Sequence, residues 1–180
     1  HAAVRLGMKA AVVTRLSRDD AHVVQAIRKD GIDCYPVYSP SSTLMTLEYK
    51  THDVDKRNLY VKATAGTIQP ADLDGLEARA VVVSPSLRGE VEPVFFTELR
   101  KRPGILLSAD VQGFVRVLRN ETLVYEPWPE MPEVLRNLDI LKTDAVEAAY
   151  LTGEANIEKA ASFFANMGVK EVLLSHSEGI

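Results

Sequence analysis

Short apolar runs that end in polar residues recur along this chain, and helical patterns lie between most of them. The runs have the length and β-branched composition of buried strands. Strands that alternate with helices favour a mainly parallel sheet with right-handed crossovers and helices on its faces, so the pattern predicts an α/β fold. The runs that we interpret as strands of this sheet are KAAVVT (9–14), RAVVVS (79–84), GILLSAD (104–110), NLDILKTD (137–144) and EVLLS (171–175).

Residues 34–63 have a different pattern. CYPVYS, TLMTLEYK and RNLYVKA are rich in β-branched and aromatic residues, alternate imperfectly, and are separated by turn-forming stretches. This composition predicts a small antiparallel β lid at 34–63. The α/β core is then formed by residues 1–33 and 64–180.

Helices are expected where apolar residues recur at helical spacing between these strands. One begins after Ser17, whose hydroxyl and following acids suit a helix N-terminus, and ends at Gly31. Others are expected near 90–102, from 145 to about 151, and around 157–167. The side chains expected to face the core from these helices are Val23, Val24, Ile27, Val91, Val94, Phe95, Leu99, Ile157, Ala160, Phe164 and Met167.

Composition narrows the classes of partner. A net charge of -4 and a pI of about 5.6 argue against a nucleic-acid surface, which needs clustered Lys and Arg. No apolar run is long enough to span a bilayer, so no membrane partner is expected. The single cysteine, Cys34, cannot form an internal disulfide, and the start lacks a signal-peptide pattern. We therefore expect small-molecule partners and a cytoplasmic location.

The carboxyl ends of the predicted strands are all polar. In open α/β sheets ligands bind beyond these ends, and their acids, lysine and hydroxyls could together hold a phosphate, a metal and a polyol. No Walker lysine motif, GxGxxG, HExxH or cysteine-rich metal spacing occurs in the sequence. The strand ends are Thr14-Arg15, Ser84-Pro85-Ser86, Asp110-Val111-Gln112-Gly113, Lys142-Thr143-Asp144 and Ser175-His176-Ser177.

The segment from Asp110 to Arg116 has two interpretations. Asp110, Gln112 and Arg116 can grip a polyhydroxylated ligand or the phosphoryl group passing to it. Alternatively, Asp110 forms an Asx-turn on its own backbone, Gly113 supplies a residue with positive φ, and Arg116 lies on a solvated strand face. Residue types alone favour the second interpretation.

The stretch LKTDAVEAAYLTG also has two interpretations. Asp144 followed three residues later by Glu147 is a capping box, which stabilises a helix without any ligand. The functional interpretation places Glu147 near a hydrated Mg²⁺ and Lys142 against phosphate oxygens. Likewise, Ser175 to Ser177 are either an ordinary turn or a loop that binds phosphate. Spacing alone favours the structural interpretation in both places.

Taken in order, these segments resemble the PfkB, or ribokinase-like, family of carbohydrate kinases, closest to a subgroup of bacterial sugar kinases. The resemblance runs over essentially the whole chain and is most specific in LDILKTDAVEAAYLTG, in IEKAASFFANMGVKEVLLSHSEG and in SADVQGFVR. It implies a ribokinase-like three-layer sandwich with a β lid. It also implies transfer of a phosphoryl group from ATP, with Mg²⁺, to a hydroxyl of a sugar or sugar-like polyol.

The resemblance implies roles for the residues that match its motifs. Glu147 stands where a glutamate organises Mg²⁺ through water. Lys142, Asp144 and Ser175 stand near the nucleotide phosphates, although Asp144 replaces a usual Asn and Ser177 a usual Gly. The residues implied to bind the substrate are Thr43, Arg57, Asp110, Gln112 and Arg116.

Two parts of the family pattern do not occur in the sequence. These are a first strand with a sugar-binding Asp and a Gly-Ala-Gly-Asp motif whose Asp is the catalytic base. We therefore expect the chain to be a fragment that contains no catalytic residue and is inactive alone, with the base Asp beyond Ile180. The lid of this family often pairs between subunits, which implies a homodimer.

The substitutions at Asp144 and Ser177 leave an alternative open. A non-catalytic domain that senses a sugar or a nucleotide tolerates a loosened magnesium or nucleotide site. A third interpretation is an interaction protein that uses the exposed strand edges of the lid. Equilibrium binding and turnover together separate these classes.

Overall fold

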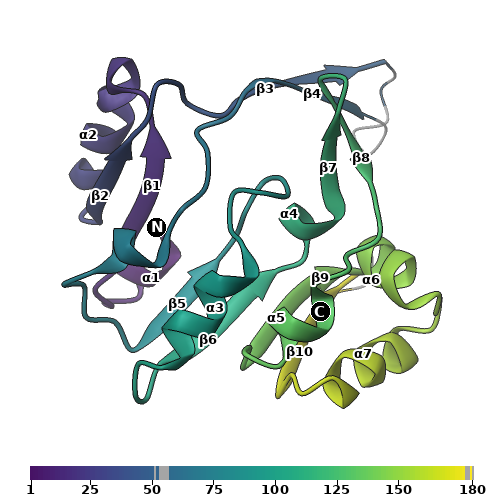
Figure 1. The fold of residues 1–180 in the computed structure, drawn as a ribbon. Coiled ribbons are helices and arrows are strands. Elements are labelled where there is room, and N and C mark those ends of the chain that lie inside the picture. Colours follow the sequence, from purple (N-terminus) through teal and green to yellow (C-terminus); the bar gives the residue numbers. More distant parts are fainter. Residues whose placement is uncertain (51, 53–56, 177–178, 180) are drawn as a thin grey trace. The chain divides into compact units, whose positions relative to one another are not determined.

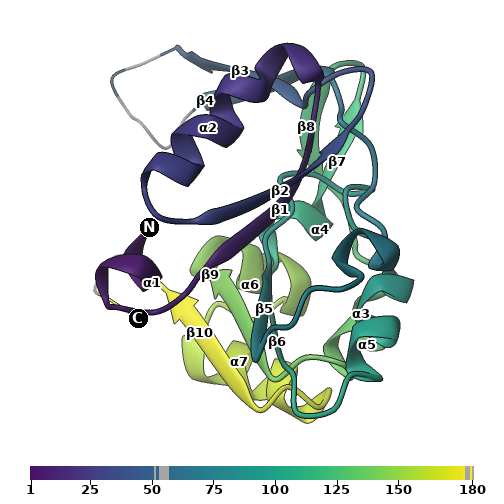
Figure 2. The same ribbon diagram turned by 90° about the vertical axis from the view of Figure 1, so that its left-hand side faces the viewer.

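The computed structural model describes residues 1–50, 52, 57–176 and 179. It divides the chain into two units, residues 1–74 and 75–180, and parallel strands form part of each unit (Figures 1 and 2). The predicted α/β class is confirmed. Ser177 lies outside the described residues.

The first unit contains a strand, a helix and a second strand. β1 (Ala11–Leu16) pairs in parallel with β2 (Asp33–Tyr38), and α2 (Ala21–Lys29) connects them. Val24 of the helix is buried with Leu16 and Cys34 of the strands. These contacts form the apolar core of this βαβ unit.

Local chemistry explains where this helix begins and ends. The Ser17 hydroxyl accepts a hydrogen bond from the backbone N–H of Asp19, 3.3 Å away, and a short 3₁₀ turn, η1 (Arg18–Asp20), leads into α2. Gly31 follows the helix with φ +78°, a left-handed conformation that glycine adopts at little cost. The prediction that Val23 faces the core is wrong, since its side chain is 42% exposed. A sheet of two strands covers only the narrow stripe around Val24.

The rest of the first unit is a hairpin and short helical turns. β3 (Leu44–Tyr49) pairs in antiparallel fashion with β4 (Arg57–Ala63), with an irregularity in register after Leu44. The short elements are α1 (Ala2–Arg5) and η2 (Pro70–Leu73).

The antiparallel prediction for residues 34–63 is confirmed for β3 and β4 but wrong for residues 34–38. Those residues belong to β2, the parallel partner of β1. β-branched and aromatic residues occur in parallel and antiparallel strands alike, so composition does not separate the two arrangements. The division of the chain into a lid at 34–63 and an α/β core at 1–33 and 64–180 remains a prediction.

The second unit has a four-stranded parallel sheet in the order β10-β9-β6-β5. Its central strands carry side chains that are fully buried, among them Leu107, Ala109 and Leu141. Burial on both faces explains why these strands read as nearly continuous apolar runs. The strands are β5 (Ala80–Val83), β6 (Leu106–Asp110), β9 (Ile140–Asp144) and β10 (Glu171–Ser175).

Helices connect these strands and supply the rest of the core. α3 packs against α5, and α6 packs against α7 (Figure 1). Phe96, Leu99 and Phe164 are fully buried, whereas Val94, predicted to face inward, is exposed. The helices are α3 (Pro93–Arg100), α4 (Gln112–Val115), α5 (Met131–Leu135), α6 (Ala145–Thr152) and α7 (Ile157–Asn166).

A second hairpin follows α4. β7 (Arg116–Arg119) and β8 (Thr122–Tyr125) pair in antiparallel fashion. The two residues between them, Asn120 and Glu121, have φ of 46° and 64°, as a type I′ turn requires.

Gly113 has a different role from the predicted one. It lies inside α4 and is not among the residues with positive φ. A β-carbon at this position would overlap the carbonyl oxygen of Pro85. Glycine is required here because the backbone of α4 lies directly against the loop that follows β5, not because of a left-handed turn.

Asp139 joins three elements at the amino-terminal ends of the strands. Its carboxylate accepts hydrogen bonds from the Leu107 N–H at 2.8 Å, from Arg100 at 2.8 Å and from Lys170 at 2.7 Å. Burial works to raise the pKa of Asp139, but these hydrogen bonds outweigh it and lower the pKa to about 2. This cluster is structural, since it lies at the opposite ends of the strands from the polar residues predicted to bind ligands.

Candidate functional site

The register of the parallel sheet brings polar strand ends together. Asp110, the last residue of β6, lies opposite Lys142 of β9, and Asp144 at the end of β9 lies opposite Ser175 at the end of β10. Because all four strands run in the same direction, these residues share one edge of the sheet. We call Asp110, Lys142, Asp144, Glu147 and Ser175 the strand-end cluster.

Asp110 uses both carboxylate oxygens in this cluster. Oδ2 lies 3.1 Å from Lys142 Nζ, and Oδ1 accepts a hydrogen bond from the Gln112 backbone N–H at 3.1 Å. The second contact is the predicted Asx-turn. The first is an ion pair between neighbouring strands, in which the Lys142 side chain remains partly exposed. The lysine is thus held in place while its ammonium group remains accessible to an anion.

Asp144 and Glu147 form the predicted capping box at the start of α6. Asp144 Oδ1 accepts a hydrogen bond from the Glu147 N–H at 2.7 Å, and Glu147 Oε2 accepts one from the Asp144 N–H at 3.1 Å. The Glu147 side chain is only 1% exposed. A capping box at an ordinary helix end leaves its glutamate on the surface, so burial distinguishes this one.

Burial has an electrostatic consequence for Glu147. Loss of solvent raises the pKa of its carboxyl group, and the negative charges of Asp144 and Asp110 add to this effect. The hydrogen bond from Asp144 N–H and the positive charge of Lys142 act in the opposite direction. A carboxylate in this setting is stabilised further by any cation that binds beside it.

The described residues do not form a direct metal site. Within residues 1–50, 52, 57–176 and 179, no three His, Cys, Asp or Glu side chains converge as metal ligands. Mg²⁺ commonly keeps several waters and takes only one or two protein carboxylates together with substrate phosphates. The carboxylates of Asp110, Asp144 and Glu147 could supply the one or two ligands that a hydrated Mg²⁺ needs, directly or through water.

Arg116 lies at the start of β7, after α4. The prediction of a solvated strand face fits it poorly, since the residue is half-buried and its Nε is buried without a hydrogen-bond partner in the described part of the chain. An unpaired cationic donor in a buried position is unfavourable. Arg116 therefore differs from Arg119 on the same strand, which forms an exposed ion pair with Glu126.

Ser175 is half-buried at the end of β10, and the backbone of His176 after it forms a bridge with Gly179. Thr43 and Arg57 belong to the first unit, whereas the strand-end cluster belongs to the second. Thr43 Oγ1 accepts a hydrogen bond from the Ala65 N–H at 3.1 Å, and Arg57 begins β4 opposite Tyr49.

Two tyrosines near the cluster were missed by sequence reasoning. Tyr125 ends β8, and its ring lies edge-on against that of Tyr150 in α6, with ring centres 5.5 Å apart. Isolated tyrosines are common at strand ends, so no sequence signal separates these two. Their position depends on the pairing of β7 with β8, which places Tyr125 beside α6.

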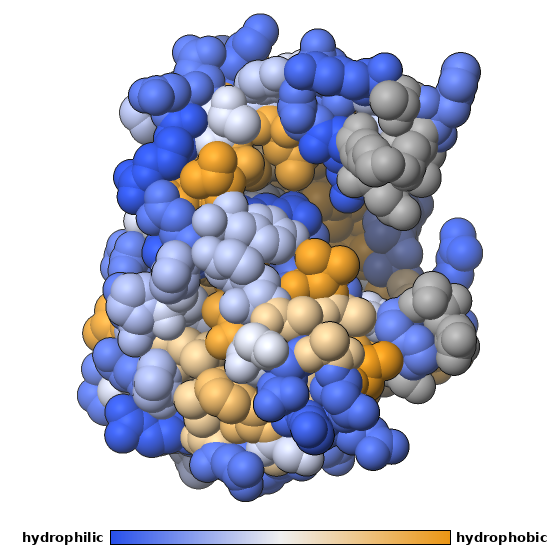
Figure 3. Space-filling view, turned by 90° about the vertical axis from the view of Figure 1, so that its right-hand side faces the viewer, coloured by the Kyte–Doolittle hydropathy of each residue, from blue (hydrophilic) through white to orange (hydrophobic). Residues whose placement is uncertain are grey.

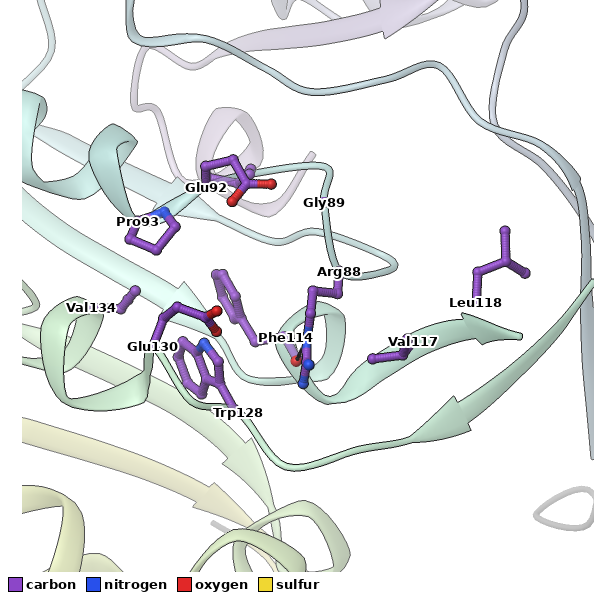
Figure 4. A pocket seen from close by; sticks show the side chains of 11 residues that line it. Arg88, Gly89, Glu92, Pro93, Phe114, Val117, Leu118, Trp128, Glu130 and Val134 are labelled. Atoms are coloured by element: carbon purple, nitrogen blue, oxygen red, sulfur yellow. Dashed lines mark hydrogen bonds between the residues drawn. The ribbon is translucent and has the colours of Figure 1, made fainter. Parts of the chain in front are cut away.

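A cavity of about 260 Å³ is lined by Phe114 of α4 together with Arg88 and Trp128 (Figure 4). The rings of Phe114 and Trp128 stack there 4.4 Å apart. Arg88 also lines it, but its guanidinium donates hydrogen bonds to the backbone carbonyls of Phe114, Glu126 and Pro127 at 2.7–3.0 Å. None of the residues predicted to bind a ligand lines this cavity, and its arginine is engaged in holding the backbone.

Comparison with known proteins places this geometry in context. Neither profiles of protein families nor characterised protein sequences gave a match. In the described part of the chain, no helix is long and apolar enough to cross a membrane.

Solved structures do match. A pyrophosphate-dependent kinase of the ribokinase family, in complex with sulfate, is 33% identical over 96% of this chain, with a TM-score of 0.88. A pyrophosphate-dependent ribokinase-family kinase in complex with a pyrophosphate analogue and myo-inositol is 32% identical over 96%, with a TM-score of 0.87. The fructokinase of Vibrio cholerae O395, bound to fructose, ADP and calcium, is 20% identical over 97%, with a TM-score of 0.71. This chain covers 61%, 60% and 59% of those chains.

Proposed function

The chain belongs to the ribokinase, or PfkB, family, and on that premise we propose that it forms part of a kinase that phosphorylates a hydroxyl of a sugar or sugar-like polyol. The observation that carries this proposal is the Asp110–Lys142 ion pair beside the buried Glu147 at one edge of the parallel sheet. This is an arrangement of charge suited to phosphoryl transfer, which depends mainly on positioning and on neutralising phosphate oxygens.

Each residue of the strand-end cluster has a proposed role. Lys142 binds phosphate oxygens, and Asp110 orients its ammonium group. Asp144 and Ser175 contact the phosphates from neighbouring strands. Glu147 holds Mg²⁺ through water, and the ion supplies charge neutralisation between phosphate oxygens when it is bound.

The other predicted site residues have a proposed role in binding the acceptor. Gln112 and Arg116, which follow Asp110 along the chain, contact the acceptor or the transferred group in this proposal. Thr43 and Arg57 contact the acceptor from the β3–β4 hairpin. Myo-inositol occurs in one of the similar kinases and fructose in another, so a cyclic polyol is the first acceptor to test. A base Asp outside this chain, a homodimer paired through the lid and a cytoplasmic location remain predictions.

The phosphoryl donor has two candidates. The resemblance in sequence implies ATP, and ADP is bound in the fructokinase. Three of the matching structures exceed 30% identity, and all three are of pyrophosphate-dependent kinases, which favours pyrophosphate for this chain as a second candidate. Lys142 and Glu147 suit either donor, because both present a terminal phosphoryl group with Mg²⁺.

The test is a donor-by-acceptor matrix with the purified natural protein. ATP or pyrophosphate is supplied with Mg²⁺ and with myo-inositol, fructose or no acceptor, and phosphorylated acceptor is measured by mass spectrometry. We expect product that requires both donor and acceptor. Ligand binding by calorimetry without any product would instead support a sensing domain. Neither binding nor turnover would support a role in protein interaction.

A further inference from the structure

The β7–β8 hairpin places Arg116 and Tyr125 directly opposite each other. The next pair along, Val115 and Glu126, is hydrogen-bonded, since the Glu126 N–H donates to the Val115 carbonyl at 2.9 Å. Arg116 and Tyr125 therefore form a non-hydrogen-bonded pair, in which the side chains of an antiparallel ladder are closest. The two side chains share one face of the hairpin.

Tyr125 connects this hairpin to the helix that carries Glu147. Its ring meets Tyr150 at an interplanar angle of 70°, a favourable edge-on geometry. Tyr150 is three residues after Glu147, so both lie on the same face of α6. β8 and α6 lie on the right-hand side of Figure 1, and Figure 3 shows that side from the front. Apolar residues form patches there within a largely hydrophilic surface.

The effects on the pKa of the Tyr125 hydroxyl agree with a position between Arg116 and α6. Burial raises its pKa, and the negative charges of Glu147 and Asp144 raise it further. The charge of Arg116 and a hydrogen bond with its side chain lower it. The hydroxyl thus lies within electrostatic reach of both the arginine and the capping box.

One group in this arrangement lacks a partner. Arg116 Nε is buried, and no described residue accepts its hydrogen bond. A bound anion would suit this donor, because planar guanidinium groups bind carboxylate and phosphate oxygens well. Lys142 supplies a second positive charge in the strand-end cluster, where it lowers the pKa of Glu147.

We propose that Tyr125 is a positioning residue: fixed by Tyr150, its hydroxyl holds the Arg116 guanidinium where Nε–H binds a phosphoryl oxygen of the donor. This inference rests on the proposed function, since it names part of the donor site of that kinase. It assigns a role in donor binding to Tyr125, at the end of β8, and to Tyr150, in α6. The formation of this strand and this helix does not by itself require a tyrosine at either position.

The test is a double-mutant cycle in the natural protein, with pyrophosphate and ATP as probes in calorimetry and in steady-state kinetics. Tyr125→Phe retains the ring and loses only the hydroxyl. We expect donor binding to weaken about tenfold, as the loss of a hydrogen bond to a charged group predicts. Arg116→Gln should weaken it at least as much, and the double variant no more than Arg116→Gln alone. In Tyr125→Phe the KM for the donor should rise more than the KM for the acceptor.

Arg119→Gln is the matched control, because it removes an arginine from the same hairpin that is already paired with Glu126. It should leave donor binding unchanged. Melting temperatures identify any variant that fails to fold, and Tyr150→Phe, which keeps the aromatic contact, should behave as wild type. Unchanged donor affinity in Tyr125→Phe, or fully additive effects, would overturn the inference alone. A wild-type protein that binds neither donor would overturn the proposed function as well.

Discussion

Lys142 Nζ lies 3.1 Å from Asp110 Oδ2, and the two residues also face each other in the register of β6 and β9. The ion pair is therefore a product of sheet pairing rather than of flexible surface chains. Its lysine remains partly exposed, so it can meet a bound anion without losing its position.

Replacing this lysine should affect ligand binding more than stability. Lys142→Gln is expected to weaken donor binding at least tenfold, whereas a partly exposed ion pair contributes only about 0–1 kcal/mol to folding. Calorimetry with pyrophosphate and ATP, together with thermal unfolding, measures both. Lys101→Gln is the control, since Lys101 forms an exposed ion pair of 2.6 Å with Glu98 in α3. A loss confined to the melting temperature would mean that Lys142 is structural.

Glu147→Gln separates the two interpretations of the capping box. Glutamine still accepts the hydrogen bond of the Asp144 N–H, so the fold should remain intact. Turnover should fall and the Mg²⁺ concentration needed for half-maximal rate should rise, because the variant lacks the carboxylate charge. Asn156→Ala removes the cap of α7, in which Oδ1 accepts the Lys159 N–H at 2.9 Å. That control should cost about 1 kcal/mol and leave the Mg²⁺ dependence unchanged. The structural interpretation would hold if both variants only reduced stability.

Gly113→Ala should be among the most damaging small substitutions in the second unit. A β-carbon there overlaps backbone atoms of Pro85, which cannot rotate away. We expect a loss of about 3 kcal/mol in the free energy of unfolding, measured by urea denaturation. Gly104→Ala is the control: its φ is +73° but the surrounding space is open, so only backbone strain of about 1 kcal/mol applies. Equal losses at the two positions would contradict the steric explanation.

Glu121→Gly should stabilise the β7–β8 hairpin. Glu121 holds a left-handed φ of 64° in the turn, a conformation that costs an ordinary residue about 1–2 kcal/mol. Glycine removes that strain, but it also increases the conformational entropy of the unfolded chain, which opposes folding. The free energy of unfolding should therefore rise by about 0.5–1 kcal/mol. Thermal unfolding measures the difference. Thr122→Gly, inside β8, should have the opposite sign.

The protein should lose stability at low pH, when Asp139 becomes protonated. Its folded pKa of about 2 lies below the ordinary value of 3.8, so its ionised form stabilises the fold. This contribution, on the order of 2 kcal/mol, is complete above about pH 4 and is lost as the pH falls toward 2. Unfolding free energies of wild type and Asp139→Asn should therefore differ most at neutral pH and converge near pH 2. A constant difference across this range would show that the charge of Asp139 has no role.

The sequence predicted the parallel strands of the second unit well, because β6 and β9 begin with apolar residues and end in recognisable polar residues. The capping box was also predictable, since Asp144 and Glu147 act through local spacing. The burial of Glu147 was not, because it depends on what packs over the first turn of α6.

Pairing partners were harder to predict than elements. Residues 34–38 form a strand as expected, but nothing in their composition shows that β1 is their parallel neighbour. Arg116 and Tyr125 are separated by eight residues, and their proximity follows from the two-residue turn at Asn120 and Glu121. Helix α5 was missed, since its five residues follow a proline-rich stretch without a clear helical period.

The close contact between Gly113 and Pro85 couples two segments that are distant in the sequence, helix α4 and the loop after β5. One follows β5 and the other follows β6, and both emerge at the edge of the sheet where ligands are expected. A longer or bulkier segment at either position would displace the other, so replacement of one segment alone should disrupt folding. Sequence changes at this place are therefore expected to be tolerated only when both segments change together.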